Sequence, residues 1–464
     1  MKRNSKLISV FSSLAFMALL AQNAVATPPP IISIATSPVP SKRGLCYNSF
    51  SEGELKLLAN SKVTWAYNWA PAANEPEGIG PGKPLEFMPM IWGAGDNMLE
   101  EADAYLSTHP GVKVILGINE PMMKTEGYGG CDTSPYDAAI FWPKLEALAE
   151  KYNLEIGGPA LTWGFEPLSD GKIYSPVGWT DAFIRQYKKL YKKEPRMDYI
   201  VLHSYMDYPS AVLGFCEEYA KIYKKKIILT EFCAWSSNPN EKIHESRDAQ
   251  ISSMTQKVEA MEHDPNIVGY CWFMSHGDPN AMPYYAIFPD KDRSGKLTEL
   301  GKVYLYMSAC DKNIYYTVNA PIPAAEYVAS SNYDLDIGGK KWEEGTRFAL
   351  PIGLETASDE MKTVDGKRME LQIGGLTNRR YAEYQINFPE ERAYIFNLRI
   401  ALDKKQTFVF TCDGKEIGSA MLEPTDKKWQ TVPIELNVPA GQHVIRITSK
   451  GGAKFSKLYW FEIN

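Results

Sequence analysis

The 464-residue sequence predicts an α/β protein, a (β/α)8 TIM barrel followed by a C-terminal β-sandwich of jelly-roll type. Three observations predict this fold. The chain is longer than one hydrophobic core usually supports, eight β-rich segments alternate with helical ones, and a final region has strands without helices. We expect the barrel over residues 42–315 and the sandwich over residues 321–464.

The first residues have the pattern of an export signal, which we expect over residues 1–26. A basic start precedes an apolar run over residues 14–20, and Ala24 to Ala26 offer a small-residue cleavage site. A membrane anchor is disfavoured because this run is short for a bilayer span. The protein is therefore expected outside the cytoplasm, in the periplasm, on the cell surface or secreted.

A segment rich in Pro, Ser and Thr over residues 27–41 is expected to link this signal to the barrel. The barrel strands are expected in eight β-branched and aromatic runs: KRGLCYNS, VTWAYNWA, EFMPMIWG, KVILGINEP, EIGGPALTW, YIVLHSYM, KIILTEFC and VGYCWFM. Alternation with helices predicts a parallel sheet, and eight units favour its closure. An open doubly wound sheet is disfavoured because no Gly-rich phosphate fingerprint follows the first run.

Segments with apolar residues at helical spacing lie between most of these runs. Ser51 and Glu54 predict a capping box at the first helix, and Asp96 and Thr180 are candidate N-caps of later ones. A loop rich in Pro and Gly over residues 71–84 replaces one helix. After Pro321 the strand runs RYAEYQINF, RAYIFNLRIA, TFVFTCDG, QTVPIELNV and GQHVIRITS predict the sandwich.

Composition limits the classes of partner. A net charge of -6 with 23% charged residues gives no sign of nucleic acid or an anionic membrane as partner. Seven cysteines leave at least one unpaired and fit no zinc spacing. Cys46, Cys233 and Cys271 fall in or beside strands, where we expect small buried apolar residues. We expect a monomer with no disulfide framework, metal or cofactor.

Two glutamates end predicted barrel strands, where the chemistry of such barrels is located. Glu120 ends the fourth strand directly after Asn119, and Glu231 ends the seventh. A single glutamate there would more simply pair with a cation or cap a helix. Two of them fit glycosidic cleavage, which needs one carboxylic acid to protonate the leaving oxygen and one carboxylate opposite. No G-x-S-x-G elbow is present, so a serine esterase is disfavoured.

Polar and aromatic residues at other strand ends are candidates for the same site. His203 and Tyr205 lie on one face of the sixth strand, within expected reach of Glu231. We expect Tyr205 to donate to Glu231, whereas a histidine bonded to backbone in the core is equally open for His203. Asn68 is a candidate to bond a sugar hydroxyl. Five tryptophans are candidates to stack on sugar rings: Trp69, Trp92, Trp163, Trp235 and Trp272.

The runs GLCYN, WAYNWAP, EFMPMIWG, ILGINEP, GGPALTW, IVLHSYM and LTEF together resemble glycoside hydrolase family 128, a β-1,3-glucanase family of clan A. The resemblance extends from Lys42 to Asp311. It implies that Glu120 is the general acid/base, that Asn119 bonds the sugar 2-hydroxyl, and that Glu231 is the nucleophile of a retaining mechanism. Glu120 would then need a raised pKa, which a neighbouring ionised Glu231 supplies in part.

The function expected from this resemblance is an endo-acting hydrolysis of β-1,3-glucan of the laminarin or curdlan type. Two alternatives stay open. One is a non-catalytic β-glucan-binding protein that keeps the aromatic cleft, against which both intact glutamates argue. The other is a clan A glycosidase for a different β-linked polysaccharide, because loops set the curvature of the cleft.

The C-terminal part resembles carbohydrate-binding module family 6 through IPAAEYV, AEYQINF and LYWFEIN. That family usually carries two glutamates near its start that help to bind a structural calcium, and this chain has Pro323 and Ala325 there. Near the end, the usual Asn and Asp are replaced by Lys457 and Tyr459. These departures put both the calcium and the usual ligand cleft in doubt.

Overall fold

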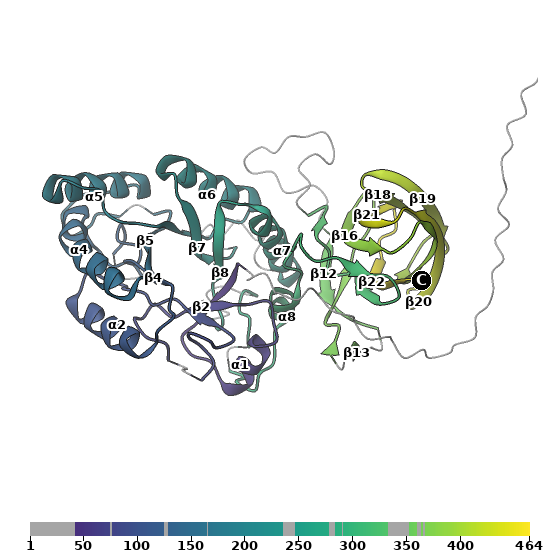
Figure 1. Ribbon diagram of the computed structural model, residues 1–464, viewed down its shortest axis with the longest axis horizontal. Helices are drawn as coiled ribbons and strands as arrows, with labels where there is room; N and C mark the ends of the chain where they lie inside the picture. Colours follow the sequence, from purple (N-terminus) through teal and green to yellow (C-terminus); the bar gives the residue numbers. More distant parts are fainter. Residues whose placement is uncertain are drawn as a thin grey trace, which may run out of the picture.

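The computed structural model shows a ring of helices around parallel strands, with a separate part made of strands beside it (Figure 1). The described residues are 42–464 apart from 75–76, 125–128, 165, 235–245, 278–283, 290, 333–351, 360–362 and 365–366. The expected signal peptide and linker lie outside the described residues, and so does Trp235.

The first part is an eight-stranded parallel sheet with the order β3-β2-β1-β8-β7-β6-β5-β4. Its strands are β1 (Arg43–Cys46), β2 (Trp65–Tyr67), β3 (Glu86–Phe87), β4 (Val114–Leu116), β5 (Glu155–Leu161), β6 (Tyr199–Ser204), β7 (Lys226–Phe232) and β8 (Ile267–Trp272). The two outer strands meet through a parallel bridge between Met90 and Leu116. The backbone N–H of Ile91 donates to the Leu116 carbonyl at 3.0 Å. The sheet therefore curls round on itself, which confirms the predicted TIM-barrel class.

Helices cover the outside of this sheet (Figure 1). They are α1 (Glu52–Leu58), α2 (Asp96–Thr108), α4 (Pro135–Tyr152), α5 (Pro176–Tyr191), α6 (Pro209–Tyr223), α7 (Arg247–His263) and α8 (Glu299–Tyr306). No helix lies between β2 and β3 in the described part of that connection, as the Pro- and Gly-rich loop predicts.

The helix starts are only partly as predicted. Ser51 and Glu54 form the expected capping box at α1. Asp96 and Thr180 are not N-caps: α2 is capped by Gly95, and Ser175 caps α5. A Ser-Pro pair explains the second error, because proline is favoured at the first helical position and serine directly before it.

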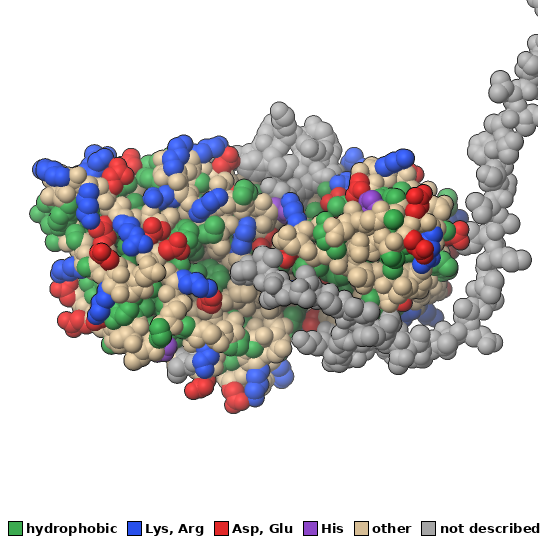
Figure 2. Space-filling model, in the orientation of Figure 1, with side chains coloured by type: hydrophobic (Ala, Val, Ile, Leu, Met, Phe, Trp, Pro, Cys, Tyr) green, Lys and Arg blue, Asp and Glu red, His purple; other side chains and the backbone are tan. Residues whose placement is uncertain are grey.

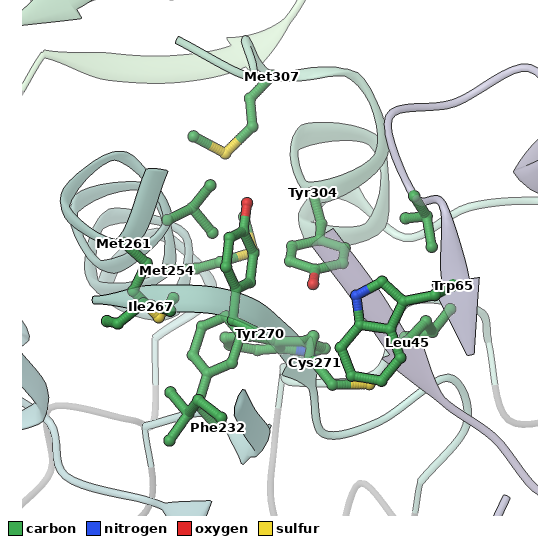
Figure 3. Close-up of a cluster of buried hydrophobic side chains, with 14 of the residues drawn as sticks. Leu45, Trp65, Phe232, Met254, Met261, Ile267, Tyr270, Cys271, Tyr304 and Met307 are labelled. Carbon is green, nitrogen blue, oxygen red and sulfur yellow. The ribbon is translucent and has the colours of Figure 1, made fainter. Parts of the chain in front are cut away.

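The barrel core is continuous with the packing between strands and helices. Figure 3 shows one of its clusters, in which side chains of β1, β2, β7 and β8 meet those of α7 and α8. Cys46, Cys233 and Cys271 are all buried, as expected of cysteines that serve as small apolar residues.

The second part consists of two facing sheets, antiparallel except for the parallel pairing of β9 with β16. One has the order β12-β15-β22-β17-β20, with β10 paired to β22, and the other β11-β16-β21-β18-β19, with β9 paired to β16. The described strands are β9 (Tyr316–Thr317), β10 (Pro321–Pro323), β11 (Ala329–Ser330), β12 (Gly353–Thr356), β13 (Thr363–Val364), β14 (Lys367–Arg368), β15 (Leu371–Gly374), β16 (Tyr381–Phe388), β17 (Arg392–Leu402), β18 (Gln406–Cys412), β19 (Lys415–Leu422), β20 (Gln430–Val438), β21 (Gly441–Lys450) and β22 (Ser456–Ile463). This part begins at Tyr316, slightly before the expected boundary.

The four positions that depart from the family 6 pattern make contacts within the sandwich. Ala325 is buried, and Pro323 pairs with Trp460 of β22. The Lys457 ammonium lies on the Glu355 carboxylate, and the buried Tyr459 hydroxyl donates to the Met369 carbonyl at 3.1 Å.

The two parts touch through α7 and α8, which contact β12 (Figure 1). Glu259 of α7 is fully buried in this contact. Its carboxylate accepts from the Ser330 backbone N–H at 2.6 Å and from the Ser330 hydroxyl at 2.7 Å. Glu299 of α8 accepts from the Thr356 hydroxyl at 2.5 Å. Hydrogen-bonded carboxylates of the barrel helices thus hold the edge of the sandwich.

Basic and acidic side chains are interspersed over the visible face of both parts (Figure 2). Helices long and apolar enough to cross a membrane are absent from the part of the chain that the structure describes.

We expect Glu259→Gln to change how stability depends on pH. Burial raises the pKa of Glu259 from 4.5 to about 7, against the hydrogen bonds from Ser330. As pH rises through this window, the unfolded chain releases the proton while the folded protein keeps it, so this group lowers stability progressively. The variant should therefore gain about 3 kcal/mol relative to wild type between pH 4.5 and 7.

Denaturant unfolding at several pH values measures this difference. Glu435→Gln, which changes an exposed carboxylate on β20, is the control and should track the wild type across the window. A constant difference between Glu259→Gln and wild type from pH 4.5 to 7 would contradict the prediction.

Candidate active site

Side chains from the carboxyl ends of three strands converge at one mouth of the barrel. Glu120 follows β4, Glu231 lies in β7 and His203 in β6. One side-chain ligand atom from each of the three lies within 4.8 Å of the others. The sequence-predicted carboxylate pair is therefore brought together, with a histidine between its members.

Glu120 is held by an unusual backbone conformation just beyond β4. Asn119 forms a parallel bridge with Ala160 of β5, and the Glu120 N–H donates to the Ala160 carbonyl at 2.9 Å. Glu120 then turns to a φ of 41°, in the left-handed region that non-glycine residues rarely adopt. Such conformations cluster at functional sites, because surrounding bonds must hold them in place. The turn leaves the side chain 5% exposed.

Glu231 is 4% exposed and is satisfied by neutral donors. Its Oε1 accepts from the Tyr67 hydroxyl at 2.9 Å and from Trp69 Nε1 at 2.8 Å. Its Oε2 accepts from the Tyr205 hydroxyl, the contact that the sequence predicts. Together these three donors fix the orientation of the Glu231 carboxylate.

His203 is fully buried and contacts both carboxylates. Its Nδ1 lies 2.6 Å from Glu120 Oε1 and 3.4 Å from Glu231 Oε2. The expected partner was Glu231, but the shorter contact is to Glu120. The alternative of a core histidine bonded to backbone is wrong, since Nδ1 meets the carboxylates and Nε2 has no partner among the described residues.

Electrostatics separate the two carboxyl groups. Burial raises the pKa of Glu120, and the nearby Glu231 charge raises it further, whereas hydrogen bonds from His203 and Thr162 lower it. The net shift is upward. Burial lowers the pKa of His203, but the two carboxylates outweigh it and the pKa is raised overall. Glu120 and His203 therefore each hold a proton more strongly than the same side chain does in water.

The two asparagines predicted for the site, Asn119 and Asn68, differ in their hydrogen bonds. Asn119 donates from Nδ2 to the Gly129 carbonyl at 3.1 Å, while its buried Oδ1 has no partner within the described structure. That oxygen can accept from a hydroxyl beside Glu120. Asn68 has its amide engaged within its own loop, donating to the Ala72 carbonyl at 3.0 Å and accepting from the Ala70 N–H at 3.2 Å.

The tryptophans predicted to stack on sugar rings differ in their exposure and in their distance from the two glutamates. Trp69 lies in the site, and its ring meets Phe273 edge to face at a 5.9 Å centroid distance. Trp92 is partly exposed, and its carbonyl accepts from the Asn119 N–H at 2.8 Å, which ties it to the turn at Glu120. Trp163 is 62% exposed, and its ring meets Phe215 of α6 edge to face at a 6.3 Å centroid distance.

Trp272 is the wrong prediction among the tryptophans. It is fully buried, and its Nε1 donates to the Tyr285 carbonyl at 2.7 Å. Its ring packs beside Phe232 and against Tyr304 of α8, on the helix-facing side of β8. The error is one of strand parity, because adjacent residues of a strand point to opposite faces.

Tyr67 and Thr162 are site residues that were not predicted from the sequence. Tyr67 is the last residue of β2, and its strand-end position could have indicated it. Thr162 follows β5 directly and hydrogen bonds to Glu120. Its strand-end position was the available signal.

Two groups of side chains in the described residues have the spacing of metal ligands. One is the Glu120, His203 and Glu231 set itself, in which the atoms bond to one another. The other joins Cys412, Asp413 and His443 on the sandwich. There the Asp413 carboxylate lies 2.7 Å from His443 Nδ1, while His443 Nε2 lies 3.1 Å from a backbone carbonyl.

We expect His203→Asn to raise the pKa of Glu120. Asparagine keeps a neutral N–H donor near the position of Nδ1 but removes the histidine charge, which lowers the pKa of Glu120. Titration of the Glu120 side-chain carbon by NMR, assigned with Glu120→Gln, should show a midpoint at higher pH than in wild type. His443→Asn, on the exposed part of the sandwich, is the control and should leave this midpoint in place. A lower midpoint in His203→Asn would refute the electrostatic assignment.

Comparison with solved structures finds β-1,3-glucanases of glycoside hydrolase family 128. A subgroup II endo-β-1,3-glucanase from Pseudomonas viridiflava is 29% identical with a TM-score of 0.49, covering 56% of this chain and 96% of that one. One from Sorangium cellulosum is 27% identical with a TM-score of 0.45 and coverages of 56% and 96%. A curdlan-specific exo-β-1,3-glucanase from Blastomyces gilchristii is 19% identical with a TM-score of 0.40 and coverages of 55% and 97%.

Comparison with curated proteins finds no match. Residues 355–464 match the family model of the carbohydrate binding module (family 6), as the resemblance of the sandwich implies. Residues 44–304 match the model described as the glycosyl hydrolase catalytic core, and this match spans more than half of the chain. With its paired glutamates at the barrel mouth, the chain therefore belongs to the glycosyl hydrolase catalytic core family.

Proposed function

We propose that this protein is a retaining, endo-acting β-1,3-glucanase of glycoside hydrolase family 128. The observation that carries the proposal is the pairing of Glu120 and Glu231, whose carboxylate oxygens approach within 4.8 Å. Retaining glycosidases hold their carboxyl groups about 5–5.5 Å apart, whereas inverting enzymes leave room for a water. The spacing supports direct attack by one carboxylate on the sugar.

The surroundings of the two carboxyl groups support an assignment of roles. Glu120 has a raised pKa and can arrive protonated, as a general acid must. Glu231 accepts three hydrogen bonds from neutral donors, which hold its carboxylate in one orientation. We therefore assign Glu120 as acid/base and Glu231 as nucleophile, the pattern in which two carboxyl groups in different environments take opposite roles.

The reaction proceeds by double displacement. Glu120 gives its proton to the glycosidic oxygen as that bond to the anomeric carbon breaks, while a Glu231 oxygen bonds to the same carbon. Glu120, now ionised, takes a proton from water, whose oxygen displaces Glu231 from the anomeric carbon. Each step inverts the configuration, so the product keeps the original one. The free Oδ1 of Asn119 is placed to accept from a sugar hydroxyl beside Glu120.

The substrate class rests on the strand-end motifs and on the aromatic mouth. The motifs around Glu120 and Glu231 resemble those of family 128, and Trp69, Trp92 and Trp163 offer faces for pyranose rings. We further propose that the protein is exported and acts as a monomer on laminarin or curdlan. The sandwich would act as a sugar-binding module, with its contacts outside the replaced calcium positions.

The alternatives are a non-catalytic β-glucan-binding protein and a clan A glycosidase for another β-linked polymer. The intact and differently tuned carboxyl groups disfavour the first, because binding alone requires neither a raised pKa nor a strained Glu120 backbone. The second is tested by the choice of polysaccharide.

Release of reducing sugar from laminarin, curdlan, mixed-linkage glucan and carboxymethylcellulose tests the proposal. Glu120→Gln and Glu231→Gln should each lower kcat on laminarin by about 100- to 10,000-fold, since each removes a proton donor or the nucleophile. Glu155→Gln, which changes an exposed residue at the start of β5, is the control and should keep full activity.

Each outcome has a consequence. Binding of laminarin without cleavage by the wild type would establish the lectin-like alternative, and cleavage of carboxymethylcellulose alone would exclude the β-1,3 assignment. The first product should be the β-anomer by NMR, and an α-anomer would refute retention. Curdlan should yield oligosaccharides of mixed length, whereas glucose as the sole early product would refute endo action.

A further inference from the structure

Helix α7 carries polar residues on the side that faces the barrel. Gln250, Ser253 and Lys257 follow one another at steps of three and four, so they share one face of the helix. Gln250 and Lys257 are each 1% exposed. The core-facing stripe of a barrel helix is ordinarily apolar, so a buried polar stripe needs a partner of its own.

The partners are backbone carbonyls just beyond β6 and β7. Lys257 Nζ donates to the Met206 carbonyl at 2.5 Å and to the Cys233 carbonyl at 3.2 Å. The next carbonyl along each segment is taken by the same helix face: Ser253 Oγ donates to Asp207 O at 2.9 Å, and Gln250 Nε2 donates to Ala234 O at 2.7 Å.

These contacts begin where the strand pairing stops. The last pair between β6 and β7 is Ser204 with Phe232. Tyr205 directly follows Ser204, and Glu231 directly precedes Phe232. Lys257 thus joins the two segments through one ammonium group beyond the last backbone pair, next to the residues whose hydrogen bond orients the nucleophile.

We propose that Lys257 is a positioning residue, whose ammonium ties the ends of β6 and β7 together and so holds the Tyr205 hydroxyl on Glu231. Ser253 and Gln250 support the same two segments. The effect on catalysis rests on the proposed glucanase function; the effect on the segments does not.

A lysine is a costly choice at this position unless its donors are needed. Burial lowers the pKa of Lys257 to about 8, which reflects the cost of holding its charge away from water. A methionine would fill the same length without that cost but would leave two buried carbonyls without a donor. The bonds to both segments explain why a cation occupies the interior side of the helix.

Lys257→Met tests the proposal. We expect kcat to fall by about 10- to 100-fold with KM changed less than threefold, because a small displacement of catalytic groups affects the chemical step more than binding. The matched control is Val258→Ala, which opens a cavity at the next, fully buried residue of the same helix. It should lower Tm at least as much while kcat stays within about twofold. An equal loss of kcat in both variants would overturn the proposal.

Amide hydrogen exchange gives a readout that does not depend on activity. Lys257→Met should speed exchange at Tyr205, Met206 and Cys233, and Val258→Ala should not. Unchanged exchange in these segments would refute the positioning role even if the wild type cleaves no glucan. If Lys257→Met does not fold, Ser253→Ala removes the single bond to Asp207 and should produce smaller changes of the same sign, and its failure to do so would count equally against the proposal.

Discussion

A carboxylate buried at the mouth of the barrel sets what the surrounding strands must supply. Glu231 is 4% exposed, and an ionised group so placed needs several hydrogen-bond donors. Tyr205 comes from the segment after the adjacent strand β6, but Tyr67 comes from β2, which is separated from β7 by β1 and β8. A flat sheet would hold Tyr67 too far away. The hydrogen bonds to Glu231 therefore depend on the curling and closure of the sheet.

The second carboxyl group at this mouth, that of Glu120, has different hydrogen-bond partners. Glu231 receives its closest hydrogen bonds from neutral donors, whereas Glu120 shares its closest hydrogen bond with His203, a group with a raised pKa. His203 Nδ1 lies nearer to Glu120 than to Glu231, so the two carboxyl groups differ in their closest neighbours. Two glutamates with the same intrinsic chemistry thus have different hydrogen-bond partners, and the left-handed turn at Glu120 brings its side chain to that histidine.

The fold and the carboxylate pair could be predicted because one shows in the alternation of strand and helix segments and the other in the position of two glutamates at strand ends. Eight apolar strand runs indicated the barrel, and Glu120 and Glu231 stood where strands end. The prediction for Trp272 was wrong because a position at the end of a strand does not say which face of the sheet the side chain is on. A shift of one residue moves a side chain from the barrel mouth to the helix layer, where Trp272 is buried. The partner of His203 could not be predicted either, because it depends on the φ of Glu120, which the sequence does not show.

Helix α7 links the two parts of the molecule, and its burial on both sides could not be predicted from the sequence. Lys257 and Glu259 are two positions apart and so point to nearly opposite sides of the helix, one to the segments beyond β6 and β7 and one to Ser330 of the sandwich. Both sides are buried and both carry ionisable groups, so no single apolar stripe marks this helix. Without the sandwich, Glu259 would lose the two donors of Ser330 and face solvent. The sandwich thus packs on the helix that also contacts the segment directly after β7, so that this outer-layer helix is buried on both sides.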